Sequence, residues 1–254
     1  MQKGRLIVIK TGKQNKDLRS RRKNNLLLDT APFQVKEAYK SARTNIMFSL
    51  SEKSCKKIII TSSFPKEGKS TTCANLAITF AQTGAKVLII DADIRKPRMH
   101  KMFGAPHNIG VTNVLAGNSS VEEAIIKTGY DNLDLLIAGH IPPNPAEMLS
   151  SMAMSNLLDV LSGKYEYIFI DTPPVNVVTD TLILSKKVSG VFMVVRIGLT
   201  DHKALKESVS KLEFANAKPL GFILNDVDVA NNSYKYNYKK YTYKKYRYMD
   251  EDYK

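Results

Sequence analysis

Three residues that can bind phosphate groups follow one another in the segment Gly68-Lys69-Ser70. The preceding residues 57–60 are mostly apolar and those after Ser70 favour a helix, which predicts a strand, a tight loop and a helix start. In such a loop successive backbone N–H groups point inward and can surround a polyphosphate, and the helix dipole adds positive charge. Lys69 can reach the terminal phosphates, and the Ser70 hydroxyl can ligate magnesium. The spacing therefore predicts a phosphate-binding P-loop.

The predicted loop covers residues 63–70, and it departs from the usual motif at its first position. Ser63 stands where a glycine is usual, so the short Gly-Lys-Ser pattern also fits an ordinary turn before a helix. Gly68 leaves room for the backbone to approach the phosphates. The residues predicted to bind the nucleotide here are Ser63, Phe64, Pro65, Lys66, Glu67, Gly68, Lys69, Ser70 and Thr71.

Acidic residues are predicted at the ends of two buried strands. Residues 86–91 form an apolar run that ends in Asp91, with Asp93 two residues later, and residues 165–171 end in Asp171. The carboxyl ends of parallel strands lie at the edge where such sheets bind ligands. The Asp171 pattern is that of a Walker B strand, whose acid usually holds a magnesium-bound water.

Together these residues indicate phosphoryl transfer, which needs positioning and charge neutralisation more than covalent chemistry. Lys69, Ser70, Asp93 and Asp171 can supply both, and the last three of these are the candidate magnesium ligands. Asp91 is left as the candidate base for an acceptor hydroxyl. The cofactors implied are ATP and Mg²⁺.

Strand-like and helix-like segments alternate through residues 57–225, which predicts an α/β P-loop NTPase fold. Its sheet would be doubly wound and mostly parallel, with helices on both faces. We expect three regions: a basic flexible arm (1–31), the P-loop domain (32–230) and a tail (231–254). The further expected elements are helices at about 35–46, 68–83, 110–117, 146–162 and 201–214, and strands at 133–137, 190–196 and 219–225.

Charge is concentrated at the two ends of this chain of 254 residues. Of the net +14, residues 1–25 carry +8 and residues 234–254 carry +4, so the middle is almost neutral. This argues against a basic nucleic-acid groove in the fold, and the ends could contact an anionic membrane surface or acidic partners, or serve solubility alone. The sequence contains no apolar run of about 18 residues, so no membrane-spanning helix is predicted. The two cysteines, Cys55 and Cys73, predict no disulfide framework, and Cys73 is expected to be a small buried thiol in a reducing cytosol.

The tail has a composition of its own, because it holds eight of the twelve tyrosines, alternating with Lys, Asn and Arg. Such a pattern could stack on single-stranded nucleic acid, could provide phosphate acceptors, or could be low-complexity sequence without a role. These eight residues are Tyr234, Tyr236, Tyr238, Tyr241, Tyr243, Tyr246, Tyr248 and Tyr253.

The sequence resembles the bacterial tyrosine kinases of capsule and exopolysaccharide synthesis, the CpsD/CapB type, over roughly residues 33–225 and the tail. Residues 63–70 match that family's Walker A motif, 87–97 its Walker A′ motif and 168–174 its Walker B motif, while 142–149 resemble the segment between the last two. The resemblance implies an ATP-dependent protein-tyrosine kinase that autophosphorylates its tail tyrosines and regulates polysaccharide synthesis. It also implies that Asn225 contacts adenine.

The resemblance further implies partners and a location. Split-form kinases of this type are cytoplasmic and are activated at the inner face of the membrane by an adaptor of the polysaccharide co-polymerase type. They form rings in which one subunit's tail enters the next subunit's site, and a cognate phosphotyrosine phosphatase opposes them; no nucleic-acid partner is expected. The ring-forming motif corresponds to Glu37, Lys40 and Arg43. The family more often has Arg in place of Lys40, and Lys lacks the planar fork, so we expect a weaker or different contact. The alternative for this triplet is local pairing along one helix.

Two other functions remain open. A regulatory ATPase of the MinD/ParA type would carry a signature lysine at the position of Phe64, and this sequence lacks it. A nucleotide-gated scaffold would assemble with ATP and bind a partner through the tail without catalysis. ATP turnover without phosphotyrosine would favour the first alternative, and assembly with neither would favour the second.

Overall fold

A computed structural model of the chain describes residues 5–8, 26–27, 31–50 and 55–227. In these residues eight strands form one sheet in the order β1-β8-β7-β2-β6-β3-β5-β4. All neighbouring strands are parallel except β4 and β5. The predicted α/β fold with a mostly parallel sheet is therefore confirmed. The strands are β1 (Arg5–Val8), β2 (Lys56–Ser62), β3 (Val87–Asp91), β4 (Ile125–Lys127), β5 (Leu133–Leu136), β6 (Tyr167–Asp171), β7 (Gly190–Arg196) and β8 (Pro219–Asn225).

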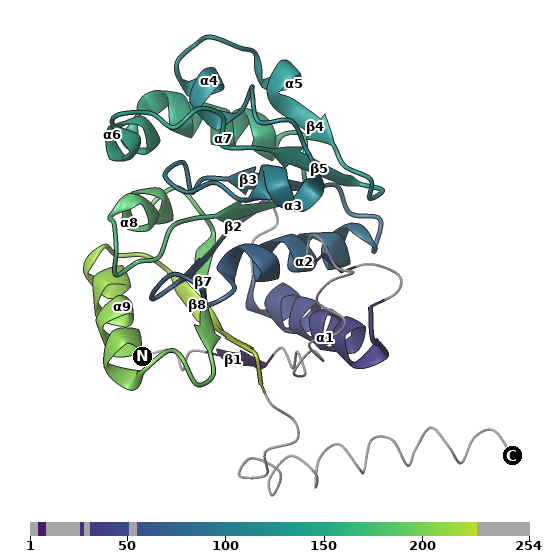
Figure 1. Cartoon of the computed structure of the whole chain (residues 1–254), viewed down its shortest axis with the longest axis vertical. Helices are drawn as coiled ribbons and strands as arrows, with labels where there is room; N and C mark the ends of the chain where they lie inside the picture. Colours follow the sequence, from purple (N-terminus) through teal and green to yellow (C-terminus); the bar gives the residue numbers. More distant parts are fainter. Residues whose placement is uncertain (1–4, 9–25, 28–30, 51–54, 228–254) are drawn as a thin grey trace, which may run out of the picture.

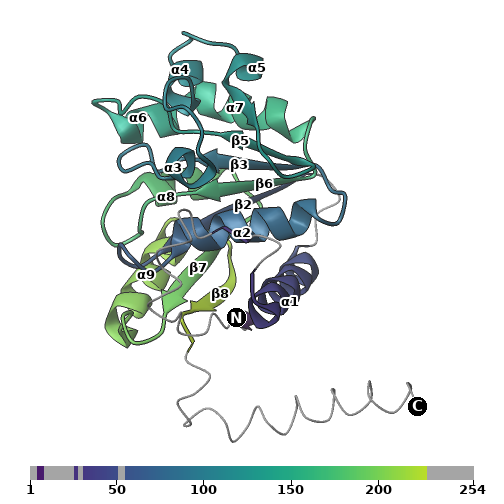
Figure 2. The same cartoon turned by 45° about the vertical axis from the view of Figure 1, so that its right-hand side comes forward.

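Helices cover both faces of this sheet. On one face, α1 and α2 lie side by side, whereas α8 and α9 cover the other face (Figure 1), and the turned view in Figure 2 shows the same arrangement. The helices are α1 (Phe33–Ser49), α2 (Lys69–Ala81), α3 (Met99–Phe103), α4 (Val111–Leu115), α5 (Val121–Ala124), α6 (Pro145–Ser150), α7 (Met152–Ser162), α8 (Asp180–Ser185) and α9 (His202–Phe214).

Alternation along the buried strands divides the core into two layers. In β2, Ile58 and Ile60 face α1 and α2, whereas Ile59 faces the layer with α7 and α9. Both layers are apolar, which explains why the central strands read as continuous hydrophobic runs. The three strands β2, β6 and β3 lie next to one another at the centre, so their carboxyl ends bring the predicted loop and acids together.

The structure differs from the expected elements in three places. The single helix expected over 146–162 is wrong, because the backbone becomes extended at Ser151, whose hydroxyl accepts the N–H of Met154 and begins α7. Short elements such as α3, α8 and β4 were not predicted. Within the expected N-terminal arm, Arg5–Val8 form a strand that pairs with β8.

Two further expectations concern single residues and the chain as a whole. Cys73 is buried in α2, where burial raises the pKa of its thiol well above the ordinary value, as expected for an inert core thiol. None of the helices in the described ranges is long and apolar enough to cross a membrane. The eight tail tyrosines lie outside the described residues.

Candidate active site

The loop between β2 and α2 has the backbone geometry of a phosphate-binding loop. Lys66 and Gly68 both adopt positive φ angles, 70° and 93°, so the chain turns sharply before the first turn of α2. An added Cβ on Gly68 would lie 2.1 Å from Nδ2 of Asn225, and the positive φ alone would strain a larger residue. The positive φ therefore favours glycine at this position, and a larger residue would also have to displace the Asn225 amide.

Lys69, the first residue of α2, extends its ammonium group between two carboxylates. Its Nζ donates to Oδ2 of Asp93 at 2.8 Å and lies 3.4 Å from both carboxylate oxygens of Asp171. The Ser70 hydroxyl is 3.3 Å from the same nitrogen and is hydrogen-bonded to Asp171. We call Asp91, Asp93 and Asp171, together with Lys69, the acid cluster; all four are buried.

Electrostatics in the acid cluster follow from burial and close charges. Burial lowers the pKa of Lys69, but the carboxylates of Asp171 and Asp93 outweigh it and leave that pKa above its ordinary value. Burial raises the pKa of Asp171, against the opposing effects of Lys69 and of the hydrogen bond from Ser70. Burial and then the charge of Asp171 raise the pKa of Asp91 to about 7.

Asp91 is the member of the acid cluster with spare hydrogen-bonding capacity. Its Oδ2 accepts the backbone N–H groups of Arg98 and Met99 at 3.0 and 2.9 Å, which ties the following loop to the end of β3. Its Oδ1 is buried without a hydrogen-bond partner among the described residues. A buried acceptor without a donor is costly, and it marks Asp91 as a candidate for proton transfer.

A second set of residues holds the P-loop from the opposite side. The buried carboxylate of Glu67 accepts the Ser63 N–H at 2.8 Å and the Thr200 hydroxyl at 2.6 Å. The Ser63 hydroxyl in turn accepts from Ser208 of α9 at 2.9 Å. The Glu67 side chain thus fixes the backbone of Ser63, the residue that stands where a conventional loop has its first glycine.

Two residues at strand ends complete this support. Arg196 donates to the carbonyl oxygen of Lys66 at 3.0 Å and pairs with Asp226 at 2.9 Å. Asn225 donates from Nδ2 to the carbonyl oxygen of Glu67, also at 3.0 Å. We call the set the loop brace; its members are Glu67, Arg196, Thr200, Ser208 and Asn225.

An ion pair between Arg95 and Asp180 connects the two segments that follow the acid-bearing strands β3 and β6. Arg95 donates from Nε and Nη2 to both carboxylate oxygens of Asp180, at 2.8 and 3.0 Å, and Asp180 is fully buried at the start of α8. The loop after β3 is thereby held against the segment that follows β6. The sequence contained no signal for this pair, because nothing in the spacing of the two residues relates them.

The structure thus brings together most of the predicted site. Lys69, Ser70, Asp91, Asp93 and Asp171 converge, as predicted from the helix start after β2 and from the carboxyl ends of β3 and β6. Residues 63–68 form the loop, and residues 69–71 lie in the first turn of α2. The Glu67 carboxylate is bonded to Ser63 and Thr200, and Phe64 is 42% exposed. Asn225 reaches the loop backbone, and its proposed adenine contact stays a prediction.

The predicted ring motif lies apart from this site, on α1. Lys40 pairs with Glu37 at 2.8 Å along the helix, whereas Arg43 donates to the carbonyl oxygen of Thr79 in α2 at 2.7 Å. Within one chain, local pairing therefore accounts for the contacts of Glu37 and Lys40. A contact with another subunit stays a prediction for all three residues.

Comparison with known proteins extends the likeness beyond the motifs. A family model described as an AAA domain matches residues 55–212. Tyrosine-protein kinase YwqD of Bacillus subtilis is 40% identical over 220 residues, which cover 86% of this chain and 92% of YwqD. Among solved structures, the kinase domain of the Escherichia coli tyrosine kinase ETK has a TM-score of 0.83 at 30% identity, covering 91% of this chain and 93% of that one.

A more distant structural neighbour carries a nucleotide. The septum site-determining protein MinD from Pyrococcus horikoshii, complexed with Mg-ADP, has a TM-score of 0.58 at 27% identity. The match covers 67% of this chain and 70% of MinD. The P-loop arrangement is therefore shared by kinases and by at least one other class of protein.

Proposed function

The chain belongs to the family of bacterial tyrosine-protein kinases, and we propose that it transfers the γ-phosphate of ATP to tyrosines of its own tail. The observation that carries this proposal is the acid cluster, in which Lys69 is held between Asp93 and Asp171 beside Asp91. As in the resembling capsule and exopolysaccharide kinases, the reaction would regulate polysaccharide synthesis.

The residues present fit a nucleotide with its magnesium ion. Two carboxylates and a hydroxyl already converge on one cationic group, the Lys69 ammonium, at 2.8 to 3.4 Å. The described part of the chain has no cluster of three or more His, Cys, Asp or Glu side chains that could bind a metal by themselves. Mg²⁺ usually needs only one or two carboxylates and takes its other ligands from phosphates and water. Ser70, Asp93 and Asp171 would hold the ion in this way, together with the nucleotide. When bound, the ion neutralises charge that develops on the phosphates.

Lys69 would change partners when the nucleotide enters. Its ammonium group would leave the carboxylates for the β- and γ-phosphates, while N–H groups of residues 63–70 bind the same oxygens. The carboxylates of Asp93 and Asp171 would then be available to the metal. The adenine would lie near Asn225, at the end of β8.

Asp91 would act as the general base. The tyrosine hydroxyl would give its proton to Oδ1 of Asp91 while its oxygen bonds to the γ-phosphorus, and the bond to the leaving oxygen of ADP would break. A pKa of about 7 suits a base that works near neutral pH. Because Asp91 has no exposed surface in this structure, an acceptor could reach it only after Lys69 or the following loop moves.

The acceptor would come from a neighbouring subunit in a ring, through contacts that include Glu37, Lys40 and Arg43. A membrane adaptor of the polysaccharide co-polymerase type would recruit the cytoplasmic chain to the inner membrane face and activate it. A phosphotyrosine phosphatase would reverse the modification. These proposals rest on the family resemblance.

The test is to incubate the full chain with ATP and magnesium, alone and with its adaptor, and to map phosphate on residues 234–253 by mass spectrometry. Lys69→Met should abolish labelling while leaving the fold intact. When tagged Lys69→Met protein is mixed with active enzyme, its tail should become labelled if transfer occurs between chains. ATP hydrolysis without phosphotyrosine would instead identify a regulatory ATPase, and nucleotide-dependent assembly with neither activity would identify a scaffold.

A further inference from the structure

The loop between β3 and α3 carries positive charge beside the acid cluster. Of its three basic residues, Arg95 is neutralised by Asp180. Lys96 and Arg98 are exposed, and neither has an ion-pair partner among the residues that the structure describes. Two unpaired cations therefore remain at this edge of the site.

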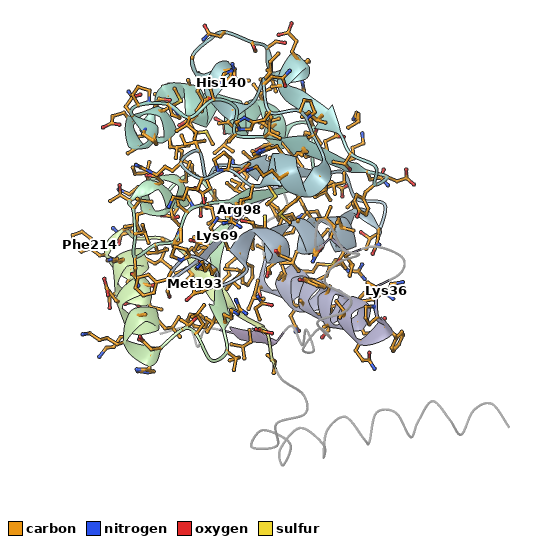
Figure 3. The ribbon with its side chains drawn as sticks, in the orientation of Figure 1. Lys36, Lys69, Arg98, His140, Met193 and Phe214 are labelled. Carbon is orange, nitrogen blue, oxygen red and sulfur yellow. The ribbon has the colours of Figure 1, made fainter. Side chains whose placement is uncertain are left out.

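The backbone of the same loop fixes where these two side chains begin. The Lys96 N–H donates to Oδ1 of Asp93 at 3.1 Å, and the Arg98 N–H donates to Oδ2 of Asp91 at 3.0 Å. The backbone of each basic residue is thus hydrogen-bonded directly to an acid of the cluster. In the view of Figure 3 the labels of Arg98 and Lys69 lie close together near the centre, and both residues are hydrogen-bonded to acids of the cluster. An acceptor tyrosine at Asp91 would place its flanking residues near Lys96 and Arg98.

The sequence of the tail changes charge abruptly. Residues 234–247 contain six basic residues and no acid, whereas residues 248–253 contain three acids and no basic residue. These acids, Asp250, Glu251 and Asp252, lie between Tyr248 and Tyr253. Each of the two tyrosines is therefore within about two residues, or about 7 Å of extended chain, of an acid.

We infer that Lys96 and Arg98 form a docking surface for the acidic segment 250–252 of a second copy of this chain, and so select Tyr248 and Tyr253 as the first acceptors. This inference rests on the proposed kinase function. The two cations attract the acidic segment and repel the basic stretch 234–247, so one surface both favours the two terminal tyrosines and disfavours the others. Because the charges are exposed, the preference should weaken as ionic strength rises.

The test compares two double variants of the full chain with the same change in charge. Lys96→Glu with Arg98→Glu reverses the docking surface, and Lys86→Glu with Lys218→Glu reverses two exposed lysines at the amino ends of β3 and β8, the opposite edge of the sheet. Mass spectrometry over time gives phosphate at each tyrosine, and nucleotide titration gives the Kd for ATP. We expect early labelling of Tyr248 and Tyr253 to fall about tenfold in the first variant only, with the Kd for ATP unchanged within twofold.

A charge swap provides the second arm. The triple variant Asp250→Lys, Glu251→Lys, Asp252→Lys should lose early labelling of the same two tyrosines, and mixing it with the reversed docking surface should restore it. Unchanged labelling order in both arms would overturn the inference, as would a large loss of ATP affinity in Lys96→Glu/Arg98→Glu, which would assign the two cations to the nucleotide. A wild-type chain that forms no phosphotyrosine would instead overturn the proposed function itself.

Discussion

The two sides of the P-loop are built for different tasks. In the loop brace, each described polar contact of Glu67 ends on a matched donor, and the charge of Arg196 is paired with Asp226. In the acid cluster, two carboxylates share one ammonium group, and Oδ1 of Asp91 has no partner among the described residues. A satisfied network rigidifies, whereas an under-satisfied one has shifted pKa values and can bind a ligand. The contrast separates the part that positions the loop from the part that would react.

The largest expected effect is on catalysis and concerns Asp91. In Asp91→Asn the amide oxygen can still accept from Arg98 and Met99, so the fold should persist, whereas the base is lost. We expect tyrosine phosphorylation to fall by about 10²- to 10⁴-fold, with little change in the Kd for ATP. Asp134→Asn, a buried acid bonded to Lys127 and Tyr165, is the control and should retain activity. Full activity in Asp91→Asn would remove the proposed base.

A pair of arginine variants sharpens the contrast in stability. Arg95→Ala leaves the fully buried Asp180 carboxylate without its partner and should lower the free energy of unfolding by about 3 kcal/mol. Arg196→Ala breaks a half-exposed pair and should cost no more than about 1 kcal/mol. Urea denaturation of both variants measures the difference, and equal losses would mean that burial of the paired acid does not set the cost of removing its arginine.

The pH dependence of stability tests the raised pKa of Asp91. Because the pKa of Asp91 is raised from 3.8 to about 7 in the folded chain, the folded state holds that proton more tightly than the unfolded state. Its contribution is fully present below about pH 4 and is lost as pH rises through about 7, a change on the order of 1–4 kcal/mol. The wild-type free energy of unfolding, relative to Asp91→Asn, should fall over this window. A flat difference would contradict the raised pKa.

The smallest effect concerns the loop brace. Glu67→Ala leaves the Ser63 N–H and the Thr200 hydroxyl without their buried acceptor, so we expect a loss of about 1–3 kcal/mol in unfolding free energy and weaker ATP binding. Glu67→Gln keeps one acceptor oxygen and should lose less. Glu207→Ala, which removes only an exposed pair with Lys211, is the matched control. If Glu67→Ala has the same free energy of unfolding as this control, the loop brace does not stabilise the fold.

Sequence patterns could predict the acid cluster because each of its acids follows a buried apolar strand, and parallel strands end at one edge. The same logic could not find Thr200 or Ser208, which meet Glu67 and Ser63 across 133 and 145 residues of sequence. It also could not show that Asp91 is fully buried, since burial depends on the side chains around it. The break at Ser151 was missed because apolar periodicity continues through it while the backbone does not.

Strand β1 has a consequence for anyone who shortens this chain. Arg5–Val8 pair with Gly221–Leu224 and make β8 an interior strand of the sheet. Removing the charged beginning of the chain as a dispensable extension would bare a row of amide and carbonyl groups on β8, and such rows recruit strands from other molecules. A protein truncated there would tend to aggregate through β8, and this aggregation could be mistaken for regulated assembly.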